Sequence, residues 1–172
     1  VVAIGALGVA LLQLAARLQE VGAAARDRAA AIDLAVVEAG ADVVQIFDSW
    51  AGELPGELLT EYCIEPIRDV IAGVKARFPA IPIIVFAKGA GYRHGEVYLG
   101  SKCQAVGIEA ESSLEFIQSV LPANAVVQGN LDPLLLLCDD DVVRNHTLRL
   151  VKSISRDRHI FNLGHGIKPQ TN

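Results

Sequence analysis

Short apolar segments, each followed by a polar or ionisable side chain, recur along the chain and alternate with stretches of helical periodicity. They cover residues 42–48, 82–87, 105–108, 125–128 and 159–162. Their β-branched and apolar residues are typical of strands buried on both faces. Strands that alternate with helices over short connections favour a parallel sheet, either open or closed into a barrel. We therefore predict an α/β fold with about five parallel strands and flanking helices.

The intervening segments carry helix signals. One helix is expected to end near Gly40, and helical periodicity returns over residues 56–78, where Pro66 indicates a break or the first turn of a second helix. A short helix is expected near residues 95–101. Ser112-x-x-Glu115 matches a capping box, and Asp139-Asp140-Asp141 is expected to cap a helix that runs to about Ser155.

The first sixteen residues, Val1 to Ala16, carry no charge. The stretch is short for a membrane span and has no basic segment before it, so we expect a buried helix or a disturbed terminus. The chain contains no Met, which suggests a processed chain, an excised domain or a fragment, and we favour a fragment. Its 172 residues suit a single domain spanning 1–172.

Composition narrows the function classes. The net charge is −5 and no run of Lys or Arg occurs, so a nucleic-acid partner is not expected. Cys63, Cys103 and Cys138 are far apart and odd in number, which favours reduced thiols in a cytoplasmic protein over disulfides or a metal site. His94 with Cys103, and Cys138 with His146, have no recognised ligand spacing, so no metal is expected.

The polar residues at the strand ends are the candidate site. In barrel enzymes the functional side chains project from the carboxyl ends of the strands. Reading those ends in order gives Asp48/Ser49, Lys88, Glu109, Asn130 and His165, with glycine nearby in four of the five cases. Glycine allows the backbone to approach a ligand closely. Five such ends favour a ligand-binding rim over a merely solvated edge.

Individual residues leave alternatives open. His165, between two glycines, is as consistent with a structural hydrogen bond as with a functional one. Ser49 lacks the G-x-S-x-G elbow of a serine nucleophile, so hydrogen bonding to a ligand is the better interpretation. Lys88 fits an anion-binding role and an ion pair with a neighbouring acid equally well.

Four strand-end motifs together resemble the uroporphyrinogen decarboxylase family. They are Gln45-Ile-Phe-Asp-Ser-Trp-Ala-Gly52, Phe86-Ala-Lys-Gly-Ala-Gly91, Gln128-Gly-Asn-Leu-Asp-Pro133 and Phe161-Asn-Leu-Gly-His-Gly-Ile167. They occur in the family's order and cover residues 39–169, whereas residues 1–31 match poorly. The resemblance implies a (β/α)8 TIM barrel, of which this chain holds strands four to eight, with both ends truncated.

The resemblance also implies an activity: cofactor-free decarboxylation of the four acetate side chains of uroporphyrinogen, giving coproporphyrinogen in porphyrin and heme biosynthesis. Protonation of a pyrrole carbon would provide the electron sink, and the protein would position the substrate and stabilise charge. Carried over by motif, Ser49 and His165 would bind substrate, with Lys88 and Asn130 as further candidates. The family also implies a homodimer.

Three departures from the family pattern accompany the resemblance. The arginine-bearing segment and the catalytic aspartate of the family have no counterpart here, and its tyrosine has no match in residues 1–28. Ile108-Glu109-Ala110-Glu111 stands where the family usually has Leu-Asp-Trp-Thr. The chain also stops before the family's last helix. The catalytic residue therefore stays unassigned, and we expect the isolated chain to be inactive.

Two alternatives stay open. Related barrels include corrinoid and thiol methyltransferases, whose zinc ligands include a cysteine at a strand end; here those ends carry Lys88 and His165 instead. The other alternative is a non-catalytic, partner-dependent fragment, because unpaired edge strands favour association.

Overall fold

The computed structural model of the chain describes residues 9–13, 31 and 34–171. Within them, six strands form one parallel sheet in which every strand pairs with its neighbour in sequence. The strands are β1 (Val9–Gln13), β2 (Val43–Asp48), β3 (Ile83–Ala87), β4 (Ala105–Gly107), β5 (Val126–Leu131) and β6 (His159–Leu163). The five expected strands and their parallel direction are confirmed.

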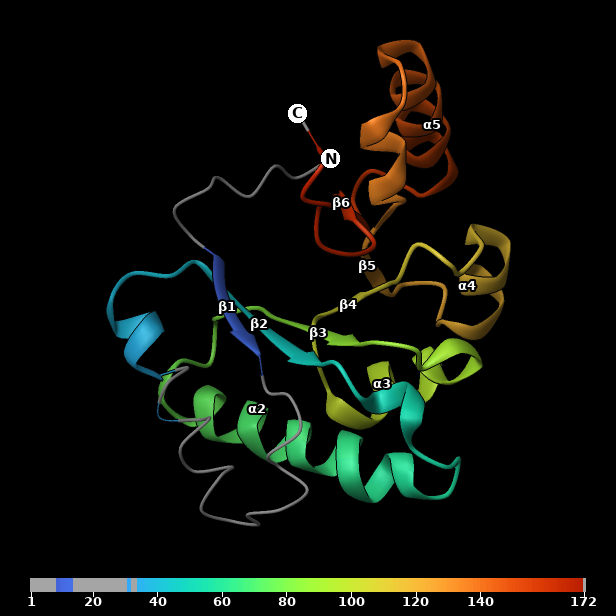
Figure 1. Cartoon of the computed structure of the whole chain (residues 1–172). Helices are drawn as coiled ribbons and strands as arrows, with labels where there is room; N and C mark the ends of the chain where they lie inside the picture. Colours follow the sequence, from blue (N-terminus) through green and yellow to red (C-terminus); the bar gives the residue numbers. More distant parts are fainter. Residues whose placement is uncertain (1–8, 14–30, 32–33, 172) are drawn as a thin grey trace.

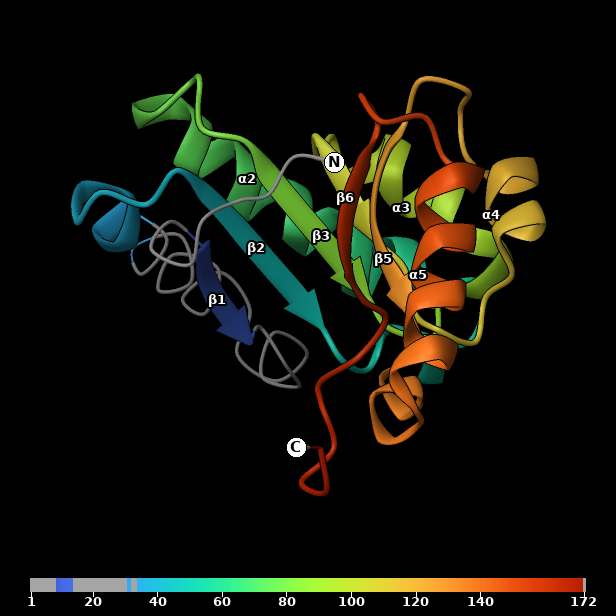
Figure 2. The same cartoon turned by 90° about the horizontal axis from the view of Figure 1, so that it is seen from above.

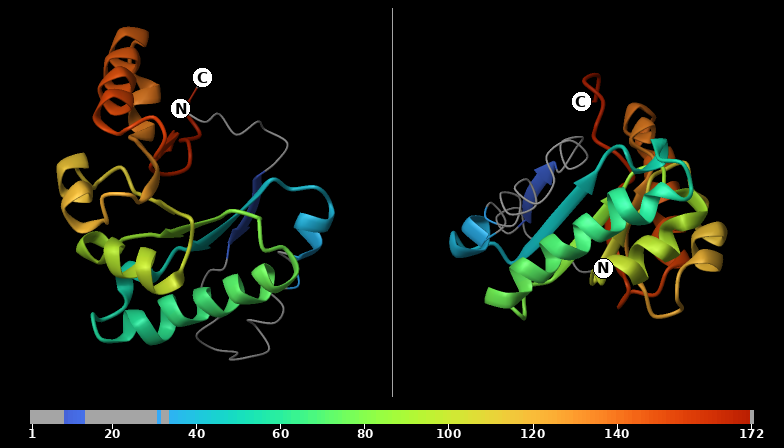
Figure 3. Two further views of the ribbon diagram at one scale, coloured as in Figure 1. Left: turned by 180° about the vertical axis from the view of Figure 1, so that it is seen from behind. Right: turned by 90° about the horizontal axis from the view of Figure 1, so that it is seen from below.

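The helices lie on the outer face of the curved sheet (Figures 1 and 2). They are α2 (Glu65–Arg77), α3 (His94–Ser101), α4 (Leu114–Val120) and α5 (Asp140–Ser153). Views from behind and from below show the same arrangement, and none of the helices in the described part of the chain covers the opposite, concave face of the sheet (Figure 3). Curvature with sequential strand order is the geometry of a (β/α) barrel wall.

Short helical turns complete the connections. They are η1 (Ala51–Glu53), the π-helical turn η2 (Thr60–Ile64), η3 (Gly91–Arg93) and η4 (Pro133–Leu137). Pro66 lies in the first turn of α2, and helical backbone continues into α2 from the π-helical turn η2, so that the proline, which has no N–H to donate, follows directly on the π turn. The helix before β2 ends at residue 38, and Gly40 follows with a φ of 101°, a backbone conformation that favours glycine.

Two expectations are wrong in detail. Residues 9–13 form β1 instead of a buried helix, while the rest of the first sixteen residues lie outside the described part. The N-cap of α4 is Ser113, whose Oγ accepts from Phe116 N, so Ser112 and Glu115 do not form a capping box. The helix expected after the three aspartates is confirmed: Asp139 is the N-cap residue of α5, Asp140 and Asp141 lie in its first turn, and α5 ends at Ser153, although Asp139 makes no side-chain cap hydrogen bond.

The main core lies between the sheet and the helices. Val44 and Ile46 of β2 and Ile83 and Val85 of β3 point to this side and pack against Ile67 and its neighbours in α2. Such aliphatic residues alternate along each strand with those of the concave face, as the two-residue period of a strand demands.

The concave face has two layers. Val43, Ile84 and Ala105, with Val126 and Ile160 against them, form an apolar layer near the amino ends of the strands. Residues two positions further along β2 and β5, Gln45 and Gln128, are amides instead. The polar layer therefore lies at the carboxyl ends of the strands.

The loops that leave β2 and β3 are in direct backbone contact. A Cβ built on Gly52 would lie 2.8 Å from the Cα of Gly89, and Gly52 N donates to Lys88 O at 2.8 Å. Lys88 N donates in turn to Asp48 O at 2.9 Å. These contacts place the first residue after β2, Ser49, beside the first residue after β3, Lys88.

Truncation of Ile67, which is fully buried in α2, is expected to lower the free energy of unfolding by about 2–5 kcal/mol, because Ile67→Ala leaves a cavity in the core. Leu99→Ala on α3 is the control, since Leu99 is 65% exposed. Urea denaturation measures both; equal losses would contradict the assigned core.

Gly52→Ala is expected to lower the free energy of unfolding by about 1–3 kcal/mol, because its Cβ would overlap the backbone of Gly89. The matched control is Gly56→Ala on the same connection, where the nearest atom lies 3.8 Å away on the flexible Arg93 side chain. Thermal and urea unfolding should leave this control within about 0.5 kcal/mol of the parent chain.

Candidate active site

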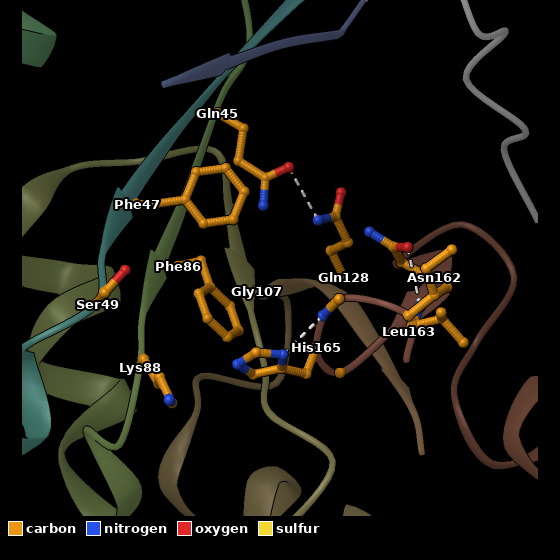
Figure 4. A pocket seen from close by; sticks show the side chains of 13 residues that line it. Gln45, Phe47, Ser49, Phe86, Lys88, Gly107, Gln128, Asn162, Leu163 and His165 are labelled. Carbon is orange, nitrogen blue, oxygen red and sulfur yellow. Dashed lines mark hydrogen bonds between the residues drawn. The ribbon is translucent and has the colours of Figure 1, made fainter. Parts of the chain in front are cut away.

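A cavity of about 480 Å³ opens at the carboxyl ends of the strands (Figure 4). Ser49, Lys88 and His165 all line it, although they follow β2, β3 and β6 respectively. The curvature of the sheet brings β6 round to face β2, so that residues 116 positions apart in sequence share one cavity. Three of the four expected substrate-binding residues therefore lie together.

Asn130, the fourth, does not line this cavity. Strand β5 continues to Leu131, three residues beyond its expected end, so Asn130 lies within the strand. Its Nδ2 donates to Glu109 O at 3.1 Å and to Ser112 O at 2.7 Å. The side chain borders a separate depression between β5 and α5. In this arrangement Asn130 supports the loop after β4.

Glu109 also departs from the expected rim. Its side chain is 6% exposed, and its two carboxylate oxygens lie 3.1 and 3.0 Å from His94 Nε2. Burial by itself would raise the pKa of Glu109, but hydrogen bonds and the charge of His94, with a hydrogen bond from Ser112, outweigh it and lower the pKa. The carboxylate contacts His94 and Ser112 and does not line the cavity.

The structure assigns a hydrogen-bonding role to one ring nitrogen of His165. Gly166 N donates to its Nδ1 at 2.8 Å, so Nδ1 acts as an acceptor. In the neutral ring the hydrogen then resides on Nε2. His165 consequently offers an N–H donor to a ligand, which suits a carboxylate oxygen.

Two amides that sequence reasoning missed form the floor of the cavity. Gln128 Nε2 donates to Gln45 Oε1 at 3.1 Å and so links β5 to β2 across the concave face (Figure 4). Both side chains are buried. A signal was available, because a glutamine within an otherwise apolar strand must find a polar partner or line a polar space.

Aromatic side chains form one wall. The rings of Phe47 and Phe86 are tilted by 60° with their centroids 5.8 Å apart. Gly107 on β4 leaves the space that Phe86 occupies, since a Cβ there would lie 2.8 Å from its Cδ2. The cavity thus combines an aromatic wall with donors from Ser49, Lys88 and His165, and among the described residues its lining contains no acid.

The remaining candidates lie elsewhere. The three cysteines are free; Cys63 and Cys103 are buried, and burial raises the pKa of both thiols. Within the described ranges, no group of three or more His, Cys, Asp or Glu residues could hold a metal ion. None of the helices described is long and apolar enough to cross a membrane.

Solved structures of similar shape include a methyltransferase from Methanosarcina mazei, with a TM-score of 0.73 and 19% identity over 86% of this chain and 43% of that chain. A dihydropteroate synthase from Xanthomonas albilineans has a TM-score of 0.61 and 17% identity over 92% of this chain and 60% of that chain. At these identities the likeness concerns the fold alone, and it confirms the expected partial TIM barrel.

Sequence comparison is more specific. The family profile described as "Uroporphyrinogen decarboxylase (URO-D)" matches residues 18–172. Uroporphyrinogen decarboxylases from Paracoccus denitrificans and Agrobacterium fabrum are each 42% identical, over 79% and 80% of this chain and 40% of their own length. The chain thus spans about two fifths of the length of these relatives. It belongs to the uroporphyrinogen decarboxylase family.

Proposed function

We propose that a protein containing this chain decarboxylates the four acetate side chains of uroporphyrinogen to coproporphyrinogen, without a metal or organic cofactor. The observation that carries the proposal is the meeting of Ser49, Lys88 and His165 around one cavity with an aromatic wall. Relatives 42% identical to this chain have the name of that enzyme.

The cavity suits an anionic, ring-containing substrate. A carboxylate that leaves water without a partner costs several kcal/mol, so each buried carboxylate needs a donor. Lys88 supplies a charge, while Ser49 and the Nε2–H of His165 supply directional hydrogen bonds. The Phe47 and Phe86 rings offer a flat apolar surface to a pyrrole ring.

The decarboxylation itself requires a proton donor and a site that orients the acetate. Protonation of a pyrrole carbon makes an electron sink, the bond to the carboxylate breaks and CO₂ leaves. The methylene carbon then takes up a proton, and the ring carbon releases the proton added first, which restores the pyrrole, so that each decarboxylation consumes one proton overall. The described residues would orient the acetate and hold its charge. Among the described residues, no acidic side chain lines the cavity. We therefore propose that the acid that donates the proton lies outside the described residues.

A chimera tests the proposal directly. The matching stretch of the Paracoccus denitrificans relative is replaced by this chain, and coproporphyrinogen formation from uroporphyrinogen is measured. Turnover is expected in the chimera and not in the isolated chain. Lys88→Met and His165→Asn should lower kcat/KM by roughly ten- to hundredfold, because a hydrogen bond to a charged group contributes about 1.5–3 kcal/mol.

Matched controls are available on α5. Lys152→Met and His146→Asn change the same residue types at exposed positions away from the cavity and should leave kcat/KM within twofold, roughly. A folded chimera without turnover, or equal losses in the cavity and control variants, would refute the proposed site.

We further propose that the protein is cytoplasmic and forms a homodimer, as the family resemblance implies. Sedimentation or light scattering of the folded chimera should give the mass of two subunits. A monomer at micromolar concentration would contradict the dimer and leave the assignment of the cavity intact.

A further inference from the structure

A buried hydrogen-bonded pair lies behind the cavity. His94, the first residue of α3, is fully buried, and its Nε2 contacts both carboxylate oxygens of Glu109, the second residue after β4. Ser112 Oγ donates to Glu109 Oε1 at 3.1 Å. His94 Nδ1 has no partner among the described residues, so Glu109 is the hydrogen-bonding partner of this ring. Neither residue of the pair lines the cavity.

The pair fixes a loop that is also held through its backbone. Asn130 Nδ2 donates to the carbonyl oxygens of Glu109 and Ser112, at 3.1 and 2.7 Å. The loop of residues 109–112, which we call the β4 loop, is therefore tied to α3 by the contact between His94 and Glu109 and to β5 by the Asn130 amide. Two separate elements, α3 and β5, therefore hold the β4 loop through hydrogen bonds.

Gly164 packs directly on the β4 loop. A Cβ at Gly164 would lie 2.2 Å from Ala110 N and 2.8 Å from the carbonyl carbon of Glu109. Gly164 N also donates to Leu131 O at 2.8 Å. With backbone against backbone there is no free space, so a shift of the β4 loop must shift Gly164. The next residue is His165, which lines the cavity.

We propose that His94 and Glu109 are positioning residues that set the place of His165 through the β4 loop and Gly164. The inference deepens the proposed function, since the place of His165 matters for catalysis only if His165 contacts substrate. The spatial claim is independent of that reaction, because it concerns the ring of His165 in the free protein.

Imidazole NMR of the whole chain tests the claim. The chain has four histidines, so the ring signals of His165, His94, His159 and the exposed His146 can be told apart by single substitutions. Glu109→Ala is expected to shift or broaden the His165 ring signals and to leave His146 unchanged. Glu111→Ala is the matched control, because Glu111 is an exposed carboxylate on the same loop.

A comparison of the single and double variants distinguishes a specific effect on His165 from a general destabilisation of the fold. If the pair acts as a unit, His94→Gln with Glu109→Ala should move the His165 signals no further than either change alone. Amide signals of β1, which lies three strands away from β4 in the sheet, should stay in place. Unchanged His165 signals in folded Glu109→Ala protein would overturn the proposal.

If Glu109→Ala fails to fold, Ser112→Ala gives a milder test, because it removes only one hydrogen bond to the Glu109 carboxylate. Ser113→Ala is its control, since Ser113 caps α4 without touching the pair. A shift of His165 in the first variant alone supports the proposal, and equal spectra in both overturn it.

Uroporphyrin binding to the chimera that carries the same substitutions distinguishes the positioning proposal from the proposed function. Glu109→Ala is expected to weaken binding about tenfold, the effect of roughly 1.4 kcal/mol. Shifted His165 signals in the chain, together with a folded chimera that binds no uroporphyrin, would support the positioning role and count against the proposed function.

Discussion

Backbone contacts between neighbouring loops hold the cavity together. Gly52 meets Gly89 where β2 and β3 end, and Gly164 meets Ala110 where β6 and β4 end. A side chain on any of these three glycines would separate the loops and move Ser49, Lys88 or His165 away from the others. Glycine is needed at these positions because the loops touch.

The chain is acidic overall, yet no acidic side chain lines the cavity among the described residues. The net charge is −5, yet the acids at the strand ends are directed elsewhere. Glu109 is paired with His94, and Asp48 Oδ1 accepts from Trp50 N. Lys88 and His165 face the cavity instead. An anion entering it therefore meets donors from three different strand ends and no nearby carboxylate from the described residues.

Much of the architecture was predictable from local pattern. The apolar runs in β2 and β3 showed buried strands, and Pro66 marked the first turn of α2, because these signals depend on neighbouring residues only. The strand β1 and the cap of α4 were missed. In β1 an uncharged stretch suits a helix and a strand equally, and at α4 two adjacent serines offer the same hydroxyl to different partners.

Sequence alone determined that polar residues follow five parallel strands and that their order matches one enzyme family. Which of them face a common cavity was decided by tertiary structure. Glu109 and Asn130 look like Lys88 and His165 in the sequence, as polar residues near a strand end. They are turned away because His94 and the backbone of the β4 loop offer them buried partners from distant elements. Those partners, like the Gln45–Gln128 bridge across 83 residues, exist only once the sheet has curved.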